Sequence, residues 1–180
     1  MKILSFFHHH RDIAAFRPRL YRLAYAWCHD AGLADDLVQD TLTRAMSRRD
    51  QLQDEQALLG WMIAILKNVW FDHLRSKRVH EDIDDWAEFI YCPGEAPDDT
   101  YGKGQLIDNL RWAVACLPMG QRQVLTLVDL EEMSYAETAR ALDIPVGTVM
   151  SRLARARGAL KVSMANRQVK RTAPLLRRVV

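Results

Sequence analysis

The chain has 180 residues, of which 49% are hydrophobic and 27% charged, and its formal net charge is +2. This length fits one ordinary domain or two small helical ones, and the composition is that of a globular protein. No apolar run approaches the roughly 18 residues that a membrane-spanning helix needs, and the opening apolar segment is too short for a secretory signal. We therefore expect a cytoplasmic protein without membrane insertion.

Neither the cysteines nor the histidines indicate a bound metal or another cofactor. The three cysteines, Cys28, Cys92 and Cys116, are widely spaced and form no CxxC pair. We therefore expect reduced thiols rather than a disulfide framework or a zinc site. The run His8–His10 is interpreted as a solvated N-terminal segment rather than as a set of metal ligands.

Apolar residues recur every three or four positions, which predicts an all-α fold of two small helical domains. A first helix is expected over about residues 12–31, with Gly32 as its stop. A second helix follows over about 34–48, and a third over about 55–77. These helices form the predicted N-terminal bundle, residues 10–78.

Residues 79–104 break this helical pattern and are predicted to be a linker. Between Glu81 and Asp99 the chain carries eight carboxylates and no Lys or Arg. Such a stretch either mimics a polyanion or is simply disordered, and both interpretations stay open. The chain ends in a basic segment, residues 162–180, which either adds salt-sensitive DNA affinity or forms a loose tail.

A second helical unit, residues 105–161, contains the most specific motif. Ser134 stands three residues before Glu137, which is the capping-box arrangement at the start of a helix. This helix is expected over Tyr135–Leu142, and a three-residue turn, 143–145, separates it from a longer helix with an apolar stripe. A short helix, a tight turn and a longer helix form a helix-turn-helix unit, whose second helix enters the major groove of DNA.

The second helix of this unit carries candidate DNA contacts. Pro145 suits the helix entrance because its missing amide would be unpaired there, and Gly147 lets the first turn approach a phosphate closely. Arginine binds guanine or phosphate in a bidentate manner, and hydroxyls reach phosphates or bases. An ordinary amphipathic helix with solvated arginines is the alternative, and the capping box and turn argue against it. The candidate contacts are Thr148, Ser151, Arg152 and Arg155.

Two parts of the sequence together resemble a known family. Residues 117–160 read LPMGQRQVLTLVDLEEMSYAETARALDIPVGTVMSRLARARGAL and are similar to the fourth conserved region of bacterial sigma factors of the extracytoplasmic-function group. The stretches DDLVQDTLTRA at 35–45 and GWMIAILKNVWFDHLRSKR at 60–78 resemble the second region of that family. The resemblance implies a protein that is not an enzyme, that binds core RNA polymerase and directs it to promoters, and that an anti-sigma factor holds inactive.

The resemblance also assigns the −35 element, as duplex DNA, to the helix-turn-helix unit. Arg152 and Arg155 are the leading base or phosphate contacts, and Thr148, Ser151 and Arg157 support them. Met150 stands where the family often has lysine, so one phosphate contact is expected to be missing.

The helix at 60–78 resembles the element that binds and melts the −10 region. Aromatic faces hold unstacked bases, and cations hold the single-stranded backbone. Trp61 is instead expected in the core, and Asp72 is expected to pair with Arg75 inside the bundle. The polar loop 49–57 corresponds to a pocket for a flipped base, without indicating which residue forms it. The expected −10 contacts are Lys67, Asn68, Trp70, Phe71, Arg75, Lys77 and Arg78.

The expected polymerase-docking residues share the exposed face of the helix at 34–48. In the family this face docks on a coiled coil of the largest polymerase subunit. Asp36 and Asp40 repel each other at helical spacing, so an external cation is a reasonable partner. A solvated acidic face is the alternative. The expected docking residues are Asp36, Gln39, Asp40 and Arg44.

Two other functions fit parts of the sequence. One is a sigma-like mimic that sequesters an anti-sigma factor without binding DNA, but a mimic has no need for Arg152 and Arg155. The other is a metal-dependent enzyme built on His8–His10, which lacks further ligands. The sequence therefore predicts no catalytic residue, metal or cofactor.

Overall fold

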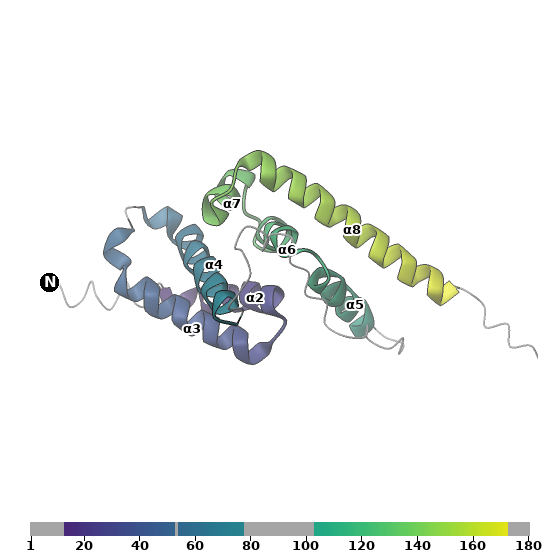
Figure 1. Ribbon diagram of the computed structural model, residues 1–180, viewed down its shortest axis with the longest axis horizontal. Helices are drawn as coiled ribbons and strands as arrows, with labels where there is room; N and C mark the ends of the chain where they lie inside the picture. The colour runs from purple at the N-terminus through teal and green to yellow at the C-terminus, as the bar shows by residue number, and fades with distance from the viewer. Residues whose placement is uncertain (1–12, 53, 78–102, 173–180) are drawn as a thin grey trace, which may run out of the picture.

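The structure, a computed structural model, describes residues 13–52, 54–77 and 103–172 of the chain. The regular elements of these residues are all helices, which confirms the all-α prediction. They form two groups that lie against each other (Figure 1). The first group comprises α2 (Arg17–Cys28), α3 (Ala31–Ser47) and α4 (Leu58–Lys77), and the second comprises α5 (Lys103–Ala115), α6 (Met119–Leu125), α7 (Tyr135–Leu142) and α8 (Val146–Thr172).

The corner between α2 and α3 differs from the expected helix over 12–31 with Gly32 as its stop. His29 ends α2 in a left-handed conformation, with φ of 54°. Asp30 then caps α3, because its carboxylate accepts a hydrogen bond from the amide of Leu33 at 2.9 Å. Aspartate at this position stabilises a helix start by about 1 kcal/mol. The expected role of Gly32 was wrong, since this glycine lies inside the first turn of α3.

The predicted loop at 49–57 contains two short 3-10 turns, η1 (Arg49–Gln51) and η2 (Glu55–Ala57). An ion pair between the side chains of Arg49 and Glu55 joins the two turns. Asp54 caps η2, because its carboxylate accepts a hydrogen bond from the amide of Gln56 at 2.9 Å. The connection from α3 to α4 is therefore organised by polar side chains of its own.

The helix-turn-helix unit forms as predicted from its local signals. The Ser134 hydroxyl accepts a hydrogen bond from the Glu137 amide at 3.2 Å, and the Ser134 amide donates to the Glu137 carboxylate at 2.8 Å. The helix that follows has the predicted bounds, Tyr135–Leu142. Asp143 turns the chain with a left-handed φ of 56°, and α8 begins directly after Pro145.

Helix α8 continues to Thr172, well beyond the predicted domain end at 161. The basic segment 162–180, for which added DNA affinity and a loose tail were both open interpretations, therefore begins as helix. Residues 161–172 are rich in helix-forming Lys, Arg, Met and Ala and contain no Gly or Pro. The helix ends two residues before Pro174, which cannot continue it.

Helix α6 runs directly into η4 (Thr126–Leu130), a single turn of π-helix. The amide of Glu131 closes this turn on the carbonyl of Thr126 at 3.1 Å. One-turn π segments change the direction in which the following side chains point. Here the turn places the carboxylate of Glu131 against α2.

The two groups of helices share one hydrophobic core. Trp27 of α2, Met62 of α4, Leu127 of η4 and Val149 of α8 belong to the same buried cluster. Helix α4 packs on α7, and α2 packs on α5, α6 and η4. The acidic stretch that was predicted to separate two domains lies mostly outside the described residues, so the predicted boundaries stay a prediction.

The cysteines differ in state. Cys28 is a free, buried thiol, and burial raises its pKa. Cys116 is disulfide-bonded, so the expectation of reduced thiols was wrong for this residue. Wide sequence spacing argues against a compact metal site but does not exclude a long-range disulfide. Among the described helices, we find none with the length and apolar character that a membrane span requires.

Candidate functional site

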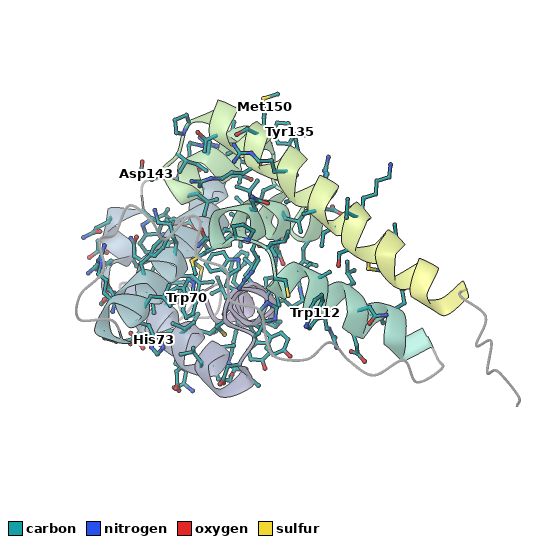
Figure 2. All side chains as sticks on the ribbon, turned by 45° about the vertical axis from the view of Figure 1, so that its right-hand side comes forward. Trp70, His73, Trp112, Tyr135, Asp143 and Met150 are labelled. Atoms are coloured by element: carbon teal, nitrogen blue, oxygen red, sulfur yellow. The ribbon has the colours of Figure 1, made fainter. Side chains whose placement is uncertain are left out.

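The apolar stripe of α8 holds the helix-turn-helix unit together. Val149, Leu153 and Ala156 are at most 2% exposed and face α6 and α7. Met150 stands on the opposite side and is 54% exposed (Figure 2). The stripe therefore fixes which residues of α8 a DNA groove can reach.

The five expected −35 contacts on this helix are not equivalent. Ser151 and Arg155 are exposed, and Thr148 is half-buried. The Ser151 hydroxyl donates a hydrogen bond to the Thr148 carbonyl at 3.1 Å. The Ser151 side chain thus stays close to the helix backbone, whereas Arg155 offers a long, exposed cationic side chain.

Arg152 and Arg157 are engaged within the second group of helices. Arg152 is half-buried against α6, where a Cβ added to Gly120 would come within 2.9 Å of the guanidinium carbon. Arg157 forms a bidentate pair with Asp129 at 3.1 and 2.5 Å, and this carboxylate raises the pKa of the arginine. In this arrangement Arg152 ties α8 to α6, and Arg157 ties it to η4.

The expected −10 contacts lie on α4, and the structure separates them into buried and exposed residues. Trp70 is 5% exposed and stacks on His73 with ring centroids 5.8 Å apart. Phe71 is half-buried against the core, whereas Asn68 and Arg75 are exposed. A base cannot reach the Trp70 ring in this arrangement. The side chain of Lys77, and Arg78 altogether, lie outside the described residues.

Lys67 points toward the second group of helices rather than to solvent. Its ammonium donates a hydrogen bond to the carbonyl of Leu142 at 3.1 Å. Burial lowers the pKa of this lysine, and the nearby charge of Asp143 opposes that shift. Trp61, expected in the core, is half-buried and packs against the core cluster.

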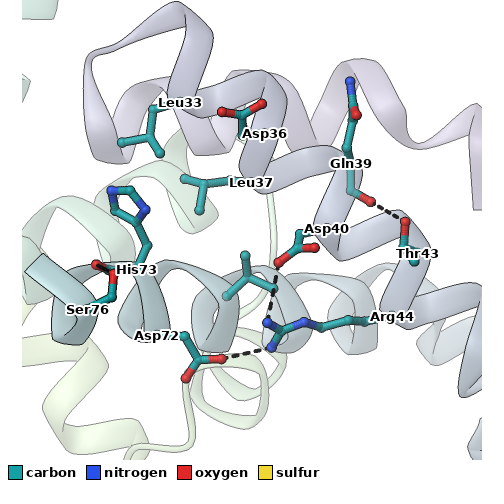
Figure 3. A pocket seen from close by; sticks show the side chains of 11 residues that line it. Leu33, Asp36, Leu37, Gln39, Asp40, Thr43, Arg44, Asp72, His73 and Ser76 are labelled. Atoms are coloured by element: carbon teal, nitrogen blue, oxygen red, sulfur yellow. Dashed lines mark hydrogen bonds and ion pairs between the residues drawn. The ribbon is translucent and has the colours of Figure 1, made fainter.

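The expected polymerase face forms one wall of a shallow hollow of about 520 Å³ between α3 and α4 (Figure 3). Arg44 bridges two carboxylates there, Asp72 at 2.8 Å and Asp40 at 3.3 Å. The cation beside Asp40 therefore comes from the chain itself, while Asp36 and Gln39 stay exposed. Asp72 also pairs with Arg75 at 3.4 Å, but on the surface and not inside the bundle as expected.

Sequence reasoning missed a set of charged residues between the two groups of helices. Arg122 is 1% exposed and donates hydrogen bonds to the carbonyls of Trp27 at 2.6 Å and Leu117 at 2.9 Å. The side chain of Glu131 is also 1% exposed and binds Arg19 and Arg22 of α2. Arg122 follows Met119 by three residues and precedes Thr126 by four, so its inward position was visible in the helical spacing.

Comparison with known proteins matches both groups of helices to one family. A family model described as "Sigma-70 region 2" matches residues 13–79, and one described as "Sigma-70, region 4" matches residues 107–160. The ECF RNA polymerase sigma factor EcfG of Rhodopseudomonas palustris (strain TIE-1) is 35% identical over 152 residues, which are 83% of this chain and 81% of that protein. The chain belongs to the ECF sigma factor family.

Further relatives agree with this assignment. The ECF sigma factor SigC of Mycobacterium tuberculosis (strain CDC 1551 / Oshkosh) is 34% identical over 75% of this sigma factor and 72% of its own length. The solved structure of the sigma factor RpoE of Bartonella quintana, in complex with the anti-sigma factor NepR, superposes with a TM-score of 0.69 at 25% identity. It covers 86% of this sigma factor and 95% of that chain. The resemblance inferred from the sequence is thereby confirmed.

Proposed function

We propose that this sigma factor binds core RNA polymerase and directs promoter-specific initiation of transcription. Helix α3 would dock on polymerase, α8 would read the −35 element as duplex, and α4 would bind the melted −10 strand. The observation that carries this proposal is the helix-turn-helix unit, in which a capped α7 and the buried seam of α8 leave Arg155 exposed for DNA. As a factor that acts on polymerase and chromosomal DNA, it would work in the cytoplasm.

The acidic face of α3 supports the polymerase part of the proposal. Asp36, Gln39 and Asp40 are exposed together beside the hollow between α3 and α4. Arg44 lies at its edge and holds Asp40 and Asp72 in place through two ion pairs. A surface that presents organised carboxylates favours a cationic protein partner and increases its rate of association.

The −35 part of the proposal divides the roles of the residues on α8. Arg155 is the leading base or phosphate contact, and Thr148 and Ser151 contact the backbone near the helix N-terminus, where the helix dipole favours phosphate. Arg152 and Arg157 position α8 on α6 and η4 in the free protein. On α4, Asn68, Phe71 and Arg75 are open to a single strand, while Lys67 and Trp70 become available only after a change in packing. Lys77 and Arg78 stay predictions.

Control by an anti-sigma factor is part of the same proposal. It is supported by family membership and by the similarity to RpoE, whose structure was solved as a complex with the anti-sigma factor NepR. A binding protein that covers both sigma regions at the same time would block promoter recognition, because recognition needs both regions.

Run-off transcription with purified core polymerase tests the proposal. Arg155→Ala should lower promoter-dependent transcript by tenfold or more, since a bidentate contact is worth about 1–3 kcal/mol. Arg111→Ala is the matched control, because Arg111 is also an exposed helical arginine but lies outside the helix-turn-helix unit. Wild-type protein that fails on every promoter of a genomic library would refute the proposal. Equal transcription by both variants would show that Arg155 makes no promoter contact. Wild-type protein that binds an anti-sigma factor but activates no promoter would favour the sigma-like mimic.

Polymerase docking is tested separately by charge reversal. Asp36→Lys should weaken co-purification with core polymerase, because it places a cation in the acidic face of α3. Asp50→Lys is the control, since Asp50 is exposed in η1, outside that face. If both variants bind polymerase equally well, α3 is not the docking surface.

A further inference from the structure

Cys116 lies at a fixed corner of the second group of helices, between α5 and α6. Its amide donates a hydrogen bond at 3.1 Å to the carbonyl of Trp112, which lies in the last turns of α5 (Figure 2). The Arg122 side chain binds the carbonyls on both sides of Cys116, those of Ala115 and Leu117. Leu117 is 3% exposed and Arg122 is 1% exposed, so this corner is part of the buried core. A covalent bond to Cys116 therefore fixes its partner to a firmly held part of the protein.

The partner of Cys116 follows from the number of cysteines. The chain has three, of which Cys28 is a free thiol and Cys116 is disulfide-bonded. The remaining cysteine is Cys92, which lies outside the described residues and within the predicted linker, 79–104. The disulfide therefore joins the linker between the two sigma regions to the corner between α5 and α6.

Such a bond is expected to be reversible in this protein. A factor that acts on polymerase works in the cytoplasm, where most thiols are kept reduced and the disulfides that do form are usually transient or redox-sensing. Cys116 is half-buried, so a small thiol can approach its sulfur. Cys28 is 6% exposed and burial raises its pKa, which keeps this thiol protonated and unreactive. Redox chemistry is thereby confined to the pair Cys92 and Cys116.

The disulfide shortens the path of chain between the two groups of helices. Helix α4 ends at Lys77 and α5 begins at Lys103, so residues 78–102 join the two groups when the cysteines are reduced. Fully extended, this path spans at most about 90 Å. In the oxidised protein, the path from Lys77 reaches Cys116 through residues 78–92 and the disulfide. It then spans at most about 60 Å, which includes about 6 Å between the two cysteine Cα atoms.

Contact with both promoter elements at once needs the longer path. Positions −35 and −10 are about 25 base pairs apart, which is about 85 Å along straight B-DNA. The reduced chain can cover this distance by itself, whereas the oxidised chain falls short by about 25 Å even when it is fully extended. The helices would then have to span the difference, and full extension would remove the conformational freedom of the chain. The disulfide therefore opposes simultaneous contact with the two elements.

We propose that the disulfide between Cys92 and Cys116 is a redox switch that sets the reach between the two DNA surfaces. This inference rests on the proposed function, because it requires α4 and α8 to contact one promoter at the same time. In the oxidised protein each surface keeps its own residues, but the two cannot engage the −10 and −35 elements together. Reduction frees residues 93–102 for the path and restores the full reach.

The oxidant is a small-molecule disulfide, and glutathione disulfide serves as the probe. The thiolate of one cysteine attacks it, forms a mixed disulfide and releases one glutathione thiolate. The thiolate of the other cysteine then attacks the protein sulfur of the mixed disulfide and releases the second glutathione. The two cysteines lose two electrons and two protons, which the two glutathione molecules gain.

Peptide mapping by mass spectrometry tests the pairing. Trypsin cleaves after Arg78, Lys103, Arg111 and Arg122, so the linked peptides are residues 79–103 and 112–122. Protein treated with glutathione disulfide should yield this pair, and dithiothreitol should separate it. Cys116→Ser should abolish the pair, whereas the control Cys28→Ala should keep it. Oxidised wild-type protein without this linked pair would overturn the proposal.

Run-off transcription with core polymerase tests the effect on promoter use, after excess reagent has been removed. The oxidised wild-type protein should give at least tenfold less transcript than the reduced protein, and dithiothreitol should restore it. Cys92→Ser should be equally active after both treatments, whereas Cys28→Ala should respond as the wild type does. Binding to an isolated −35 duplex should be the same in both forms, because it uses one surface only.

Two insertions test whether reach is the cause. About ten Gly and Ser residues inserted after His80 lengthen the path of the oxidised protein by up to about 35 Å and should restore its transcription. The same insert after Gly94 is the matched control, because it lies inside the loop that the disulfide bypasses, and it should restore nothing.

Equal transcription by oxidised and reduced wild-type protein would overturn the proposal, as would rescue by both insertions or by neither. Reduced protein that activates no promoter would refute the proposed function, and this inference with it. Reduced protein that is active, together with oxidised protein that is equally active, would refute only the inference.

Discussion

Replacing Arg122 by methionine is expected to lower the free energy of unfolding by about 4 kcal/mol. The guanidinium is 1% exposed, donates hydrogen bonds to the carbonyls of Trp27 at 2.6 Å and Leu117 at 2.9 Å, and also binds the carbonyl of Ala115. Each buried carbonyl left without a partner costs about 1–3 kcal/mol. Methionine fills the volume of the aliphatic part of the arginine side chain, and it removes the cost of burying a charge. These two effects offset part of the loss from the three unpaired carbonyls. The remainder agrees with the roughly 3–5 kcal/mol lost when one partner of a buried charged arrangement is removed.

Urea unfolding followed by tryptophan fluorescence and circular dichroism measures this loss. Trp27 contacts Arg122 directly, so fluorescence reports the site itself. The control is Arg111→Met, which changes an arginine with a 63% exposed side chain and should alter stability by no more than about 0.5 kcal/mol. A loss below about 1 kcal/mol for Arg122→Met would refute the reasoning, because it would mean that the three carbonyls find other partners.

Three further predictions concern DNA affinity, pH and helix capping. Met150→Lys adds a cation at a 54% exposed position on α8 and should tighten binding to −35 duplex. The plot of log binding constant against log salt concentration should become steeper by about 0.9. Val162→Lys, which charges a 60% exposed position further along the same helix, should do less, and equal effects of the two variants would contradict a specific contact at Met150. Burial, together with the charge of Arg122, lowers the pKa of His29 from 6.5 to about 4, so the folded state favours the neutral imidazole. The contribution of neutral His29 to the free energy of unfolding is therefore complete above pH 6.5 and is lost as the pH falls toward 4. Allowing for the partial exposure of the ring, His29→Asn, which tolerates the left-handed backbone, should remove about 1–2 kcal/mol of the loss between pH 7 and pH 4, and identical pH profiles of urea unfolding would disprove this. Ser134→Ala should cost about 1 kcal/mol by removing the capping box, measured by thermal unfolding against Ser151→Ala, whose hydroxyl caps no helix start.

The helix-turn-helix unit could be predicted closely because its signals are local. Ser134 and Glu137 cap the same turn of backbone, and the turn after Leu142 is three residues long. The corner at Asp30 was missed although its signal is equally local. Glycine is the usual residue at a helix C-terminus, and here His29 takes that backbone conformation, so Gly32 was assigned the wrong role.

The contact between the two groups of helices could not be predicted from local pattern. Arg19 and Glu131 are 112 residues apart in the chain, and the helical spacing of each indicates only which side of its own helix it occupies. The same limit applies to the candidate contacts on α8. Periodicity placed Arg152 and Arg157 near the polar face, but Gly120 and Asp129, which engage them, belong to other elements. Exposure of Arg155 and burial of Trp70 likewise depend on packing.

The shared core limits how freely the two sigma regions can be exchanged between relatives. A transplanted region 4 brings its own recognition helix, but it must also supply residues that bind α2 as Thr126 and Glu131 do. A hybrid that lacks them would leave the indole of Trp27 without its hydrogen-bond acceptor, and Arg19 and Arg22 without their carboxylate. Because the two groups of helices share one hydrophobic core, the hybrid would be less stable than either parent. The two regions and the residues at the contact between them therefore have to be exchanged together.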